Sequence, residues 1–274
     1  MNKKGVVDDL VARYGYVIID ECHHISAKSF EDVLRGCSAK YITGLSATVT
    51  RRDGHHPIVF MQCGAVRYRG HEKKHAMQRP FDHKVIVRNC DGLVFDDGED
   101  VAISEIYRRL MASNDRNLRI AKDVIAEYES GRSPLVLTER TQHLEILFKL
   151  LEPQIGRLVV LKGGLGKKRL KVIMEKLADW KDEPHVILAT GRYLGEGFDD
   201  PRLDTLFLAM PVSWRGILSQ YAGRLHRLHD DKSEVRVYDY VDQGIPALGR
   251  MFERRIKGYE ALGYKLPSPE ALLL

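Results

Sequence analysis

The strongest constraint on the fold is an alternation of short apolar runs with amphipathic helical patterns. Strand-like runs occur at 16–20, 39–45, 84–90, 133–138, 157–161, 185–189, 204–210 and 234–240. Patterns with apolar residues three and four apart separate most of these runs, for example at 27–36, 142–152 and 166–180. This alternation predicts an α/β fold built on mainly parallel sheets.

Composition limits the classes of protein that the chain can represent. Its 274 residues, 44% hydrophobic and 30% charged, fit one large or two ordinary globular domains. No stretch approaches the roughly 18 apolar residues of a membrane helix, and the start has no signal-peptide core, so we expect a cytoplasmic protein without membrane contact. The four cysteines form no CxxC pair and are expected to be reduced thiols. A net charge of +5 favours polyanionic partners.

The first apolar run ends in two acids, in the sequence VIIDECHH at 17–24. Its β-branched residues predict a strand that is buried on both faces. Ligands bind at the carboxyl ends of parallel strands, so Asp20 and Glu21 suggest a magnesium ion and a nucleotide there. The alternative is a simple turn or helix N-cap.

Two later loops carry similar chemistry. The second strand ends in GLSATVTRRDG, where Ser46 and Thr48 can hydrogen-bond to carboxylates or to phosphate-linked water. The loop ATGRYLGEGFDDP at 189–201 contains glycines, including Gly197, that let the backbone approach a ligand, and Asp199 can accept hydrogen bonds from a sugar hydroxyl. The alternative is a loop whose glycines serve only its turns.

A cationic helix follows in PVSWRGILSQYAGRLHRLH. Gln220, Arg224 and Arg227 are spaced at i, i+4 and i+7, which predicts one shared stripe on the helix. Such a stripe suits planar donors aimed at phosphate oxygens. The alternative is that these cations only oppose the helix dipole, which explains the charge but not the glutamine.

Together these motifs resemble a known family. DECH, SAT, the GEGFD loop and QYAGRLHR, in this order, resemble motifs II, III, V and VI of superfamily 2 helicases and translocases. The segment TERTQHLEILFKLL at 138–151 resembles motif IV of the branch with DNA-repair helicases and restriction-type translocases. The resemblance implies two RecA-like domains of the P-loop NTPase fold, with ATP between them. It assigns 1–80 to a truncated first domain and 81–274 to a linker and a complete second domain.

The resemblance also implies roles for the residues of the ATP site. Asp20 would hold magnesium, and Glu21 would act on the attacking water. Ser46 and Thr48 would couple the ATP state to contact with the nucleic-acid strand. The residues expected to meet the nucleotide from the second domain are Gly197, Asp199, Gln220, Arg224 and Arg227, with one arginine as the finger that stabilises the transferring phosphoryl group.

The implied macromolecular partner is nucleic acid, DNA rather than RNA. The residues expected to contact its backbone are Thr138, Arg140, Gly163, Lys167 and Thr190. Contacts of this kind are independent of base sequence and sensitive to salt.

One family element is missing from the sequence. A helicase needs a phosphate-binding loop, GxxxxGK(S/T), tens of residues before DECH, and only 19 residues precede Asp20. GGLGKK at 163–168 does not qualify, because Leu161 replaces the first glycine and Lys168 the Ser/Thr. We therefore expect a C-terminal part of a helicase that does not hydrolyse ATP alone. Its strand at 39–45 would have an unpaired edge, open to self-association or to a complementing chain.

Two other interpretations fit the same residues. The chain could be a nucleic-acid-binding or assembly module without enzymatic activity, or one half of a split helicase. ATP affinity measured with and without DNA distinguishes the binding module from the helicase.

Overall fold

The structure divides the chain into two units, Met1–Gly70 and His71–Leu274, which we describe separately. It is a computed structural model, and it describes residues 10, 13–22, 25, 28–46, 56–70, 79–90, 101–191, 198–212, 215–230, 232–242 and 244–267. None of the helices in these ranges is long and apolar enough to cross a membrane.

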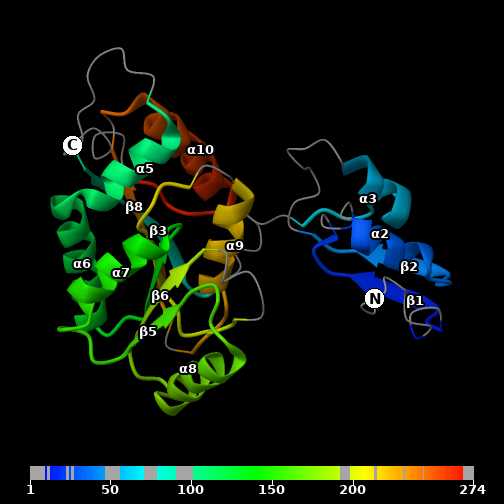
Figure 1. Cartoon of the computed structure of the whole chain (residues 1–274), viewed down its shortest axis with the longest axis horizontal. Coiled ribbons are helices and arrows are strands. Elements are labelled where there is room, and N and C mark those ends of the chain that lie inside the picture. Colours follow the sequence, from blue (N-terminus) through cyan, green and yellow to red (C-terminus); the bar gives the residue numbers. More distant parts are fainter. Residues whose placement is uncertain are drawn as a thin grey trace. The chain divides into compact units, whose positions relative to one another are not determined.

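The first unit contains β1 (Tyr16–Ile19), α2 (Lys28–Arg35), β2 (Tyr41–Gly44) and α3 (His56–Cys63) (Figure 1). β1 and β2 are parallel, with Tyr16 opposite Tyr41 and Ile19 opposite Gly44. Its core is a small cluster of buried apolar side chains, formed by Cys22, Ile25, Leu34 and Val59.

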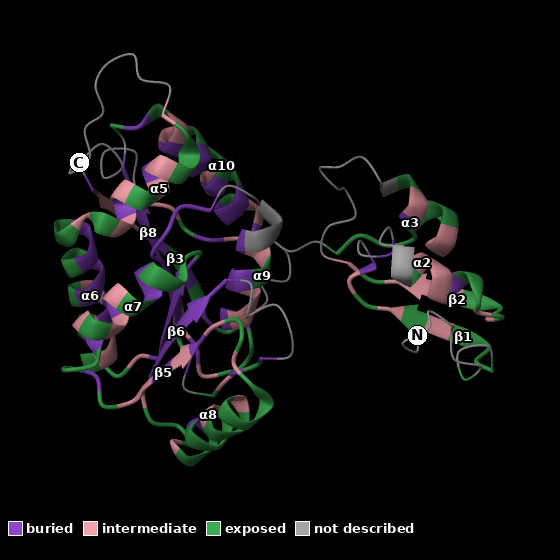
Figure 2. Ribbon diagram, in the orientation of Figure 1, coloured by how far each residue is buried: buried purple, intermediate pink, exposed green. Residues whose placement is uncertain are grey.

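The expectation that β1 is buried on both faces is wrong. Tyr16 is 54% exposed and Ile18 is 61% exposed, whereas Ile19 packs against the small core. Figure 2 accordingly colours β1 as exposed and intermediate. Side chains alternate between the two faces of a strand, so one face of β1 covers the core. In the described residues the sheet has only two strands, and Tyr16 and Ile18 stay accessible on the other face.

In the part of the second unit that the structure describes, six parallel strands form one sheet in the order β3-β8-β7-β4-β6-β5. Their bounds are β3 Asp82–Asn89, β4 Pro134–Thr138, β5 Leu158–Leu161, β6 Val186–Thr190, β7 Thr205–Leu208 and β8 Glu234–Val241. β3 pairs with β8 over its whole length, so the strand predicted at 84–90 belongs to this sheet. The predicted parallel α/β architecture is confirmed.

Helices cover both faces of this sheet (Figure 1). They are α5 (Ile103–Ala112), α6 (Asn114–Glu129), α7 (Thr141–Leu151), α8 (Lys167–Asp179), α9 (Arg215–Leu225) and α10 (Pro246–Ala261). Leu206 and Leu208 of β7 pack in a cluster with α8, α9 and α10, while Phe207 packs in a cluster with α6 and α7. Because neighbouring residues of β7 enter two separate cores, the unit has three layers.

A buried ion pair joins α10 to the sheet. Arg255 donates two hydrogen bonds to the carboxylate of Asp239 on β8, at 2.7 and 2.9 Å, and a third to the carbonyl of Val212 at 2.9 Å. Tyr259 donates to the same carboxylate at 2.8 Å. Arg255 and Asp239 are 3% and 1% exposed, so each needs the other to offset the cost of burial.

We expect Asp239→Asn to destabilise the second unit by about 3–5 kcal/mol, because it leaves the Arg255 guanidinium buried without its counter-charge. Urea denaturation followed by tryptophan fluorescence measures this, since both tryptophans, Trp180 and Trp214, belong to the second unit. Glu145→Gln, which removes the exposed pair with Lys162, is the control and should leave the unfolding midpoint unchanged. An equal midpoint for both variants would contradict the account.

Candidate functional site

The two acids of DECH lie at the carboxyl end of β1. Asp20 is exposed, and its Oδ1 accepts a hydrogen bond from the backbone N–H of Glu21 at 2.9 Å. Glu21 has a φ of 49°, a left-handed conformation that side-chain-bearing residues rarely adopt. This turn brings the Cys22 N–H to the carbonyl of Leu45, at 2.9 Å. The end of β1 is thereby tied to the end of β2, directly before Ser46; Thr48 lies outside the described residues.

The five residues expected to contact nucleic acid lie at one edge of the second sheet. Thr138 ends β4 and is paired with Thr190, which ends the neighbouring β6. Arg140 is the N-cap of α7, and Gly163 and Lys167 follow β5, the next strand. Because β4, β6 and β5 are adjacent and parallel, their carboxyl ends and the residues after them come together.

Burial separates these five residues into two kinds. Thr138 and Thr190 are 2% and 9% exposed, whereas Arg140, Gly163 and Lys167 are exposed. Only the second kind offers a side chain or backbone directly to a large ligand. The threonines instead hold the strand ends that carry the exposed residues.

A buried polar network fixes the end of β4. Thr138 Oγ1 and His143 Nδ1 are 2.8 Å apart, and His143 Nε2 and Asn117 Oδ1 are 2.9 Å apart. Burial, helped by the charge of Arg116, lowers the pKa of His143 to about 3, so its ring is neutral at physiological pH. Neither His143 nor Asn117 was among the residues predicted to form the site. The available signal was a histidine on the apolar face of the α7 pattern.

The beginning of α8 is strongly cationic. Lys167, Lys168 and Arg169 are exposed in its first turn, which contains no acid, and Gly166 is the N-cap. A helix N-terminus also carries a partial positive charge and unsatisfied N–H groups. Both features attract anions to this edge of the sheet, where Arg140 also lies.

The residues expected to meet the nucleotide form a second group, away from that edge. Arg224 donates to the carbonyl of Phe198, and Arg227 Nε lies 3.1 Å from Asp199 Oδ1. Gln220 is exposed on α9, while Leu218 and Leu225 are buried. Gly197 lies outside the described residues.

The predicted stripe on α9 is only partly correct. The helix ends at Leu225, so Arg227 lies beyond it, and only Gln220 and Arg224 lie on the helix itself. The last turn ends early because His226 N–H bonds to the carbonyl of Gly223, at 3.2 Å, in the tighter three-residue pattern.

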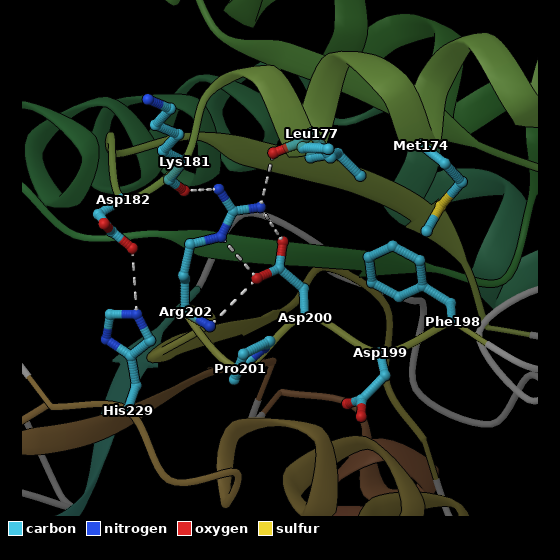
Figure 3. Close-up of a pocket in the computed structure, with 11 residues that line it drawn as sticks. Met174, Leu177, Lys181, Asp182, Phe198, Asp199, Asp200, Pro201, Arg202 and His229 are labelled. Carbon is cyan, nitrogen blue, oxygen red and sulfur yellow. Dashed lines mark hydrogen bonds and ion pairs between the residues drawn. The ribbon is translucent and has the colours of Figure 1, made fainter.

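A pocket of about 340 Å³ is lined by the segment 198–202, by the end of α8 with the residues after it, and by His229 (Figure 3). Asp200 points into a buried cluster, where it bonds to His185 at 3.0 Å and to Arg202 at 2.7 Å. Burial raises the pKa of the Asp200 carboxyl, but these hydrogen bonds outweigh it and hold the pKa well below its usual range. Asp199 points to the other side of the segment, away from this cluster (Figure 3). The two neighbouring acids therefore have separate tasks, Asp200 in the fold and Asp199 toward Arg227.

A close contact links the two groups of residues. The hydroxyl of Tyr221, on α9, lies where a Cβ atom on Gly191 would be, and Glu139 Oε1 is 3.1 Å from the same position. Gly191 directly follows β6, and its N–H donates to the carbonyl of Thr138 at 3.2 Å. Any side chain at 191 would push α9 away from the strand ends.

We expect Gly191→Ala to cost about 1–3 kcal/mol of stability through overpacking against Tyr221. The same substitution in a Tyr221→Leu background should cost much less, because the overlapping hydroxyl and ring are gone. Thermal unfolding of the four proteins in this double-mutant cycle gives the coupling free energy. Gly163→Ala, where a Cβ meets nothing within 4 Å, is the neutral control. Equal costs in both backgrounds would show that the contact is not made.

Comparison with known proteins gives the same assignment as the motifs. The family model "Type III restriction enzyme, res subunit" matches residues 6–51, which include Asp20 and Glu21. A protein of Acanthamoeba polyphaga mimivirus, named as an ATP-dependent RNA helicase, is 26% identical over 245 residues, covering 86% of this chain and 44% of that protein. A helicase of Escherichia phage T5 is 25% identical over 262 residues, covering 91% of this chain and 54% of that one.

Solved structures share the fold. An HsdR subunit of a type I restriction enzyme from Vibrio vulnificus has a TM-score of 0.66 at 18% identity, over 92% of this chain and 47% of that one. UvsW of T4 has a TM-score of 0.55 at 19% identity, over 94% and 54%. The fold is thus the expected RecA-like α/β fold, and the chain spans about half the length of the curated relatives described above. The motifs, the relatives and the shared fold together support a superfamily 2 helicase.

Proposed function

We propose that the chain is part of an ATP-dependent helicase or translocase that moves along nucleic acid. The observation that carries this proposal is the gathering of Arg140, Gly163 and Lys167 at the carboxyl edge of β4, β6 and β5. An exposed cationic edge without an acid in the first turn of α8 suits a phosphate backbone. Arg224, Arg227 and Asp199 lie in a separate region, as a protein with distinct nucleic-acid and nucleotide sites requires.

The nucleotide roles are part of this proposal. The donor chemistry at the end of β1 fits magnesium, because Asp20 offers an exposed carboxylate and this ion prefers oxygen ligands. Bound there by Asp20, magnesium would supply positive charge against the phosphates of ATP. Glu21 would orient and polarise the attacking water. Ser46 and Thr48 would couple the ATP state to contact with the nucleic-acid strand.

The second unit would complete the nucleotide site. Gly197, Asp199 and Gln220 would contact the nucleotide, and Arg224 or Arg227 would stabilise charge on the transferring phosphoryl group. The Arg227–Asp199 ion pair is half exposed on both sides, at 56% and 49%. Exposed pairs contribute little free energy, so a phosphate can replace Asp199 as the partner of Arg227.

We propose DNA as the nucleic acid that the chain binds, because the segment 138–151 resembles motif IV of the repair and restriction branch. Repair or restriction would then be the pathway and the cytoplasm the location. The residues proposed to contact the backbone remain Thr138, Arg140, Gly163, Lys167 and Thr190. The two threonines are buried in the structure, so their contribution would come from the strand ends and backbone that they hold.

A complementing polypeptide is proposed for the first unit. Tyr16, Ile18 and Tyr41 are exposed on the two-stranded sheet, and Met61 and Tyr68 are exposed in the same unit. Exposed apolar surface beside an open strand edge favours pairing with another chain, either a second copy or a segment that carries GxxxxGK(S/T).

The pure chain should not hydrolyse ATP, because its sequence contains no phosphate-binding loop. The measurement is phosphate release with and without single-stranded DNA. DNA-stimulated release that disappears in Glu21→Gln would contradict this part of the proposal, since it would show a complete catalytic site in the chain.

The chain should bind single-stranded DNA with an affinity that falls steeply with salt concentration. Arg140→Ala and Lys167→Ala should each weaken binding and reduce the slope of log K against log salt by about 0.7, because each removes one phosphate contact. Lys149→Ala, an exposed cation in the last turn of α7, is the matched control and should change neither quantity. Fluorescence anisotropy at several salt concentrations measures both.

Three outcomes decide between the alternatives. Equal slopes for all three variants would place the DNA contact elsewhere. An affinity for DNA that does not change when ATP is added would favour the non-enzymatic binding module. An affinity for RNA well above that for DNA would overturn the proposed strand preference.

A further inference from the structure

Three cations reach the segment 198–201 from the end of α9 and the turn after it. Arg224 donates to the carbonyl of Phe198, Arg227 forms an ion pair with the carboxylate of Asp199, and Lys232 donates to the carbonyl of Pro201. Lys232 belongs to none of the motifs described above. We propose that Lys232 is a positioning residue, which fixes the end of α9, and with it Arg224 and Arg227, to the segment that carries Asp199. The inference of a role in the nucleotide site rests on the proposed function.

The ammonium group of Lys232 has all its donors engaged. Its Nζ donates to the carbonyls of Leu225 at 2.9 Å, Arg227 at 2.9 Å and Pro201 at 2.7 Å. Leu225 ends α9 and Arg227 follows it, so the first two are carbonyls that lack helical N–H partners. The three hydrogen bonds therefore close the C-terminal end of α9 and join it to the neighbouring segment.

Lys232 differs from Arg227 in its burial. It is 7% exposed, whereas the side chains of Arg227 and Asp199 are about half exposed. A ligand can thus compete for Arg227 but not for Lys232. The backbone at Arg227 stays anchored while its guanidinium is free to exchange Asp199 for a phosphate oxygen. Such anchoring reduces the entropy that the arginine loses on meeting its ligand.

The charge of Lys232 is itself sensitive to pH. Burial lowers its pKa to about 8, opposed by the negative charges of Asp204 and Asp200 and assisted by Arg132. The ring of Phe81 also faces it, with Nζ at 5.7 Å from the centroid. Below this pKa the ammonium has three N–H groups for three carbonyls. Above it the neutral amine has two, so one carbonyl loses its donor, but the larger cost of burying the charge is removed.

Hydrogen exchange followed by mass spectrometry tests the proposal on the full chain without nucleotide or DNA. In Lys232→Met, amides in 221–230 and 198–203 should exchange on the order of tenfold faster, because the buried carbonyls lose charged donors. Amides of β4 and β6 should keep their wild-type rates. Lys232→Arg, which keeps the charge and several donors, should restore most of the protection. Lys149→Met is the matched control with no expected change.

A pH series on the wild-type chain provides a test that needs no variant. After correction for intrinsic exchange, protection of 221–230 should rise between about pH 7 and about pH 9, because the open state, in which Lys232 is solvated, binds more protons than the closed state. The same peptide in Lys232→Arg should show no such rise, because a guanidinium stays charged in both states.

The proposal is overturned if Lys232→Met leaves 221–230 unchanged, or if exchange rises equally in β4 and β6, which would indicate a general core residue. A pH profile identical in wild type and Lys232→Arg would also overturn it. Since no nucleotide or DNA is present, these results do not depend on the proposed function. Failure of DNA binding or of ATP dependence would refute that function and leave the anchoring of α9 intact.

Discussion

The second unit depends on the constraint that its six strands all run in one direction. Parallel strands have their carboxyl ends at a common edge, so residues that follow β4, β6 and β5 meet although they are far apart in sequence. Arg140 and Lys167 come together in this way. The helices run back from this edge, so their ends lie near the opposite edge of the sheet, where the next strand starts. α9 runs back across the sheet, and its end bonds through Lys232 to Pro201, just before β7. One constraint thus creates two chemical regions on one domain.

Buried cations and the cations of these two regions differ in the number of fixed partners that they have. In the interior, cations have several fixed partners: Arg255 bonds to Asp239 and to Val212, and Lys232 bonds to three carbonyls. Such groups cannot exchange partners without a large cost. At the strand edge Arg140 and Lys167 are exposed, and Arg227 has a weak pair with Asp199. The buried cations hold the backbone, and the exposed cations remain available to phosphate.

Much of the fold could be predicted from the sequence because its patterns are local. Each of the eight apolar runs contains a strand, and helices occur where apolar residues recur three and four apart. The exposure of Tyr16 and Ile18 could not be predicted, because a run of apolar residues says nothing about how many layers will cover it. The end of α9 before Arg227 was also missed, because the spacing pattern continues past the point where the helix tightens and stops.

The contacts within the site were less accessible from the sequence. Asp20, Glu21, Arg224 and Arg227 were recognised by their motifs. Lys232 was not, because its three acceptors are backbone carbonyls, which leave no pattern of side chains to read. The contact of Tyr221 with Gly191 joins two motifs through space, and only the folded chain reveals why that position must be glycine.

We propose that nucleic acid binds at the carboxyl edge of β4, β6 and β5. Ultraviolet crosslinking of the full chain to single-stranded oligothymidylate, with the crosslinked peptides identified by mass spectrometry, tests it most directly. The account predicts crosslinks in 138–142, 161–170 and 189–191, all at that edge. Crosslinks confined to 152–157 and 181–185, at the opposite ends of the same strands, would contradict it.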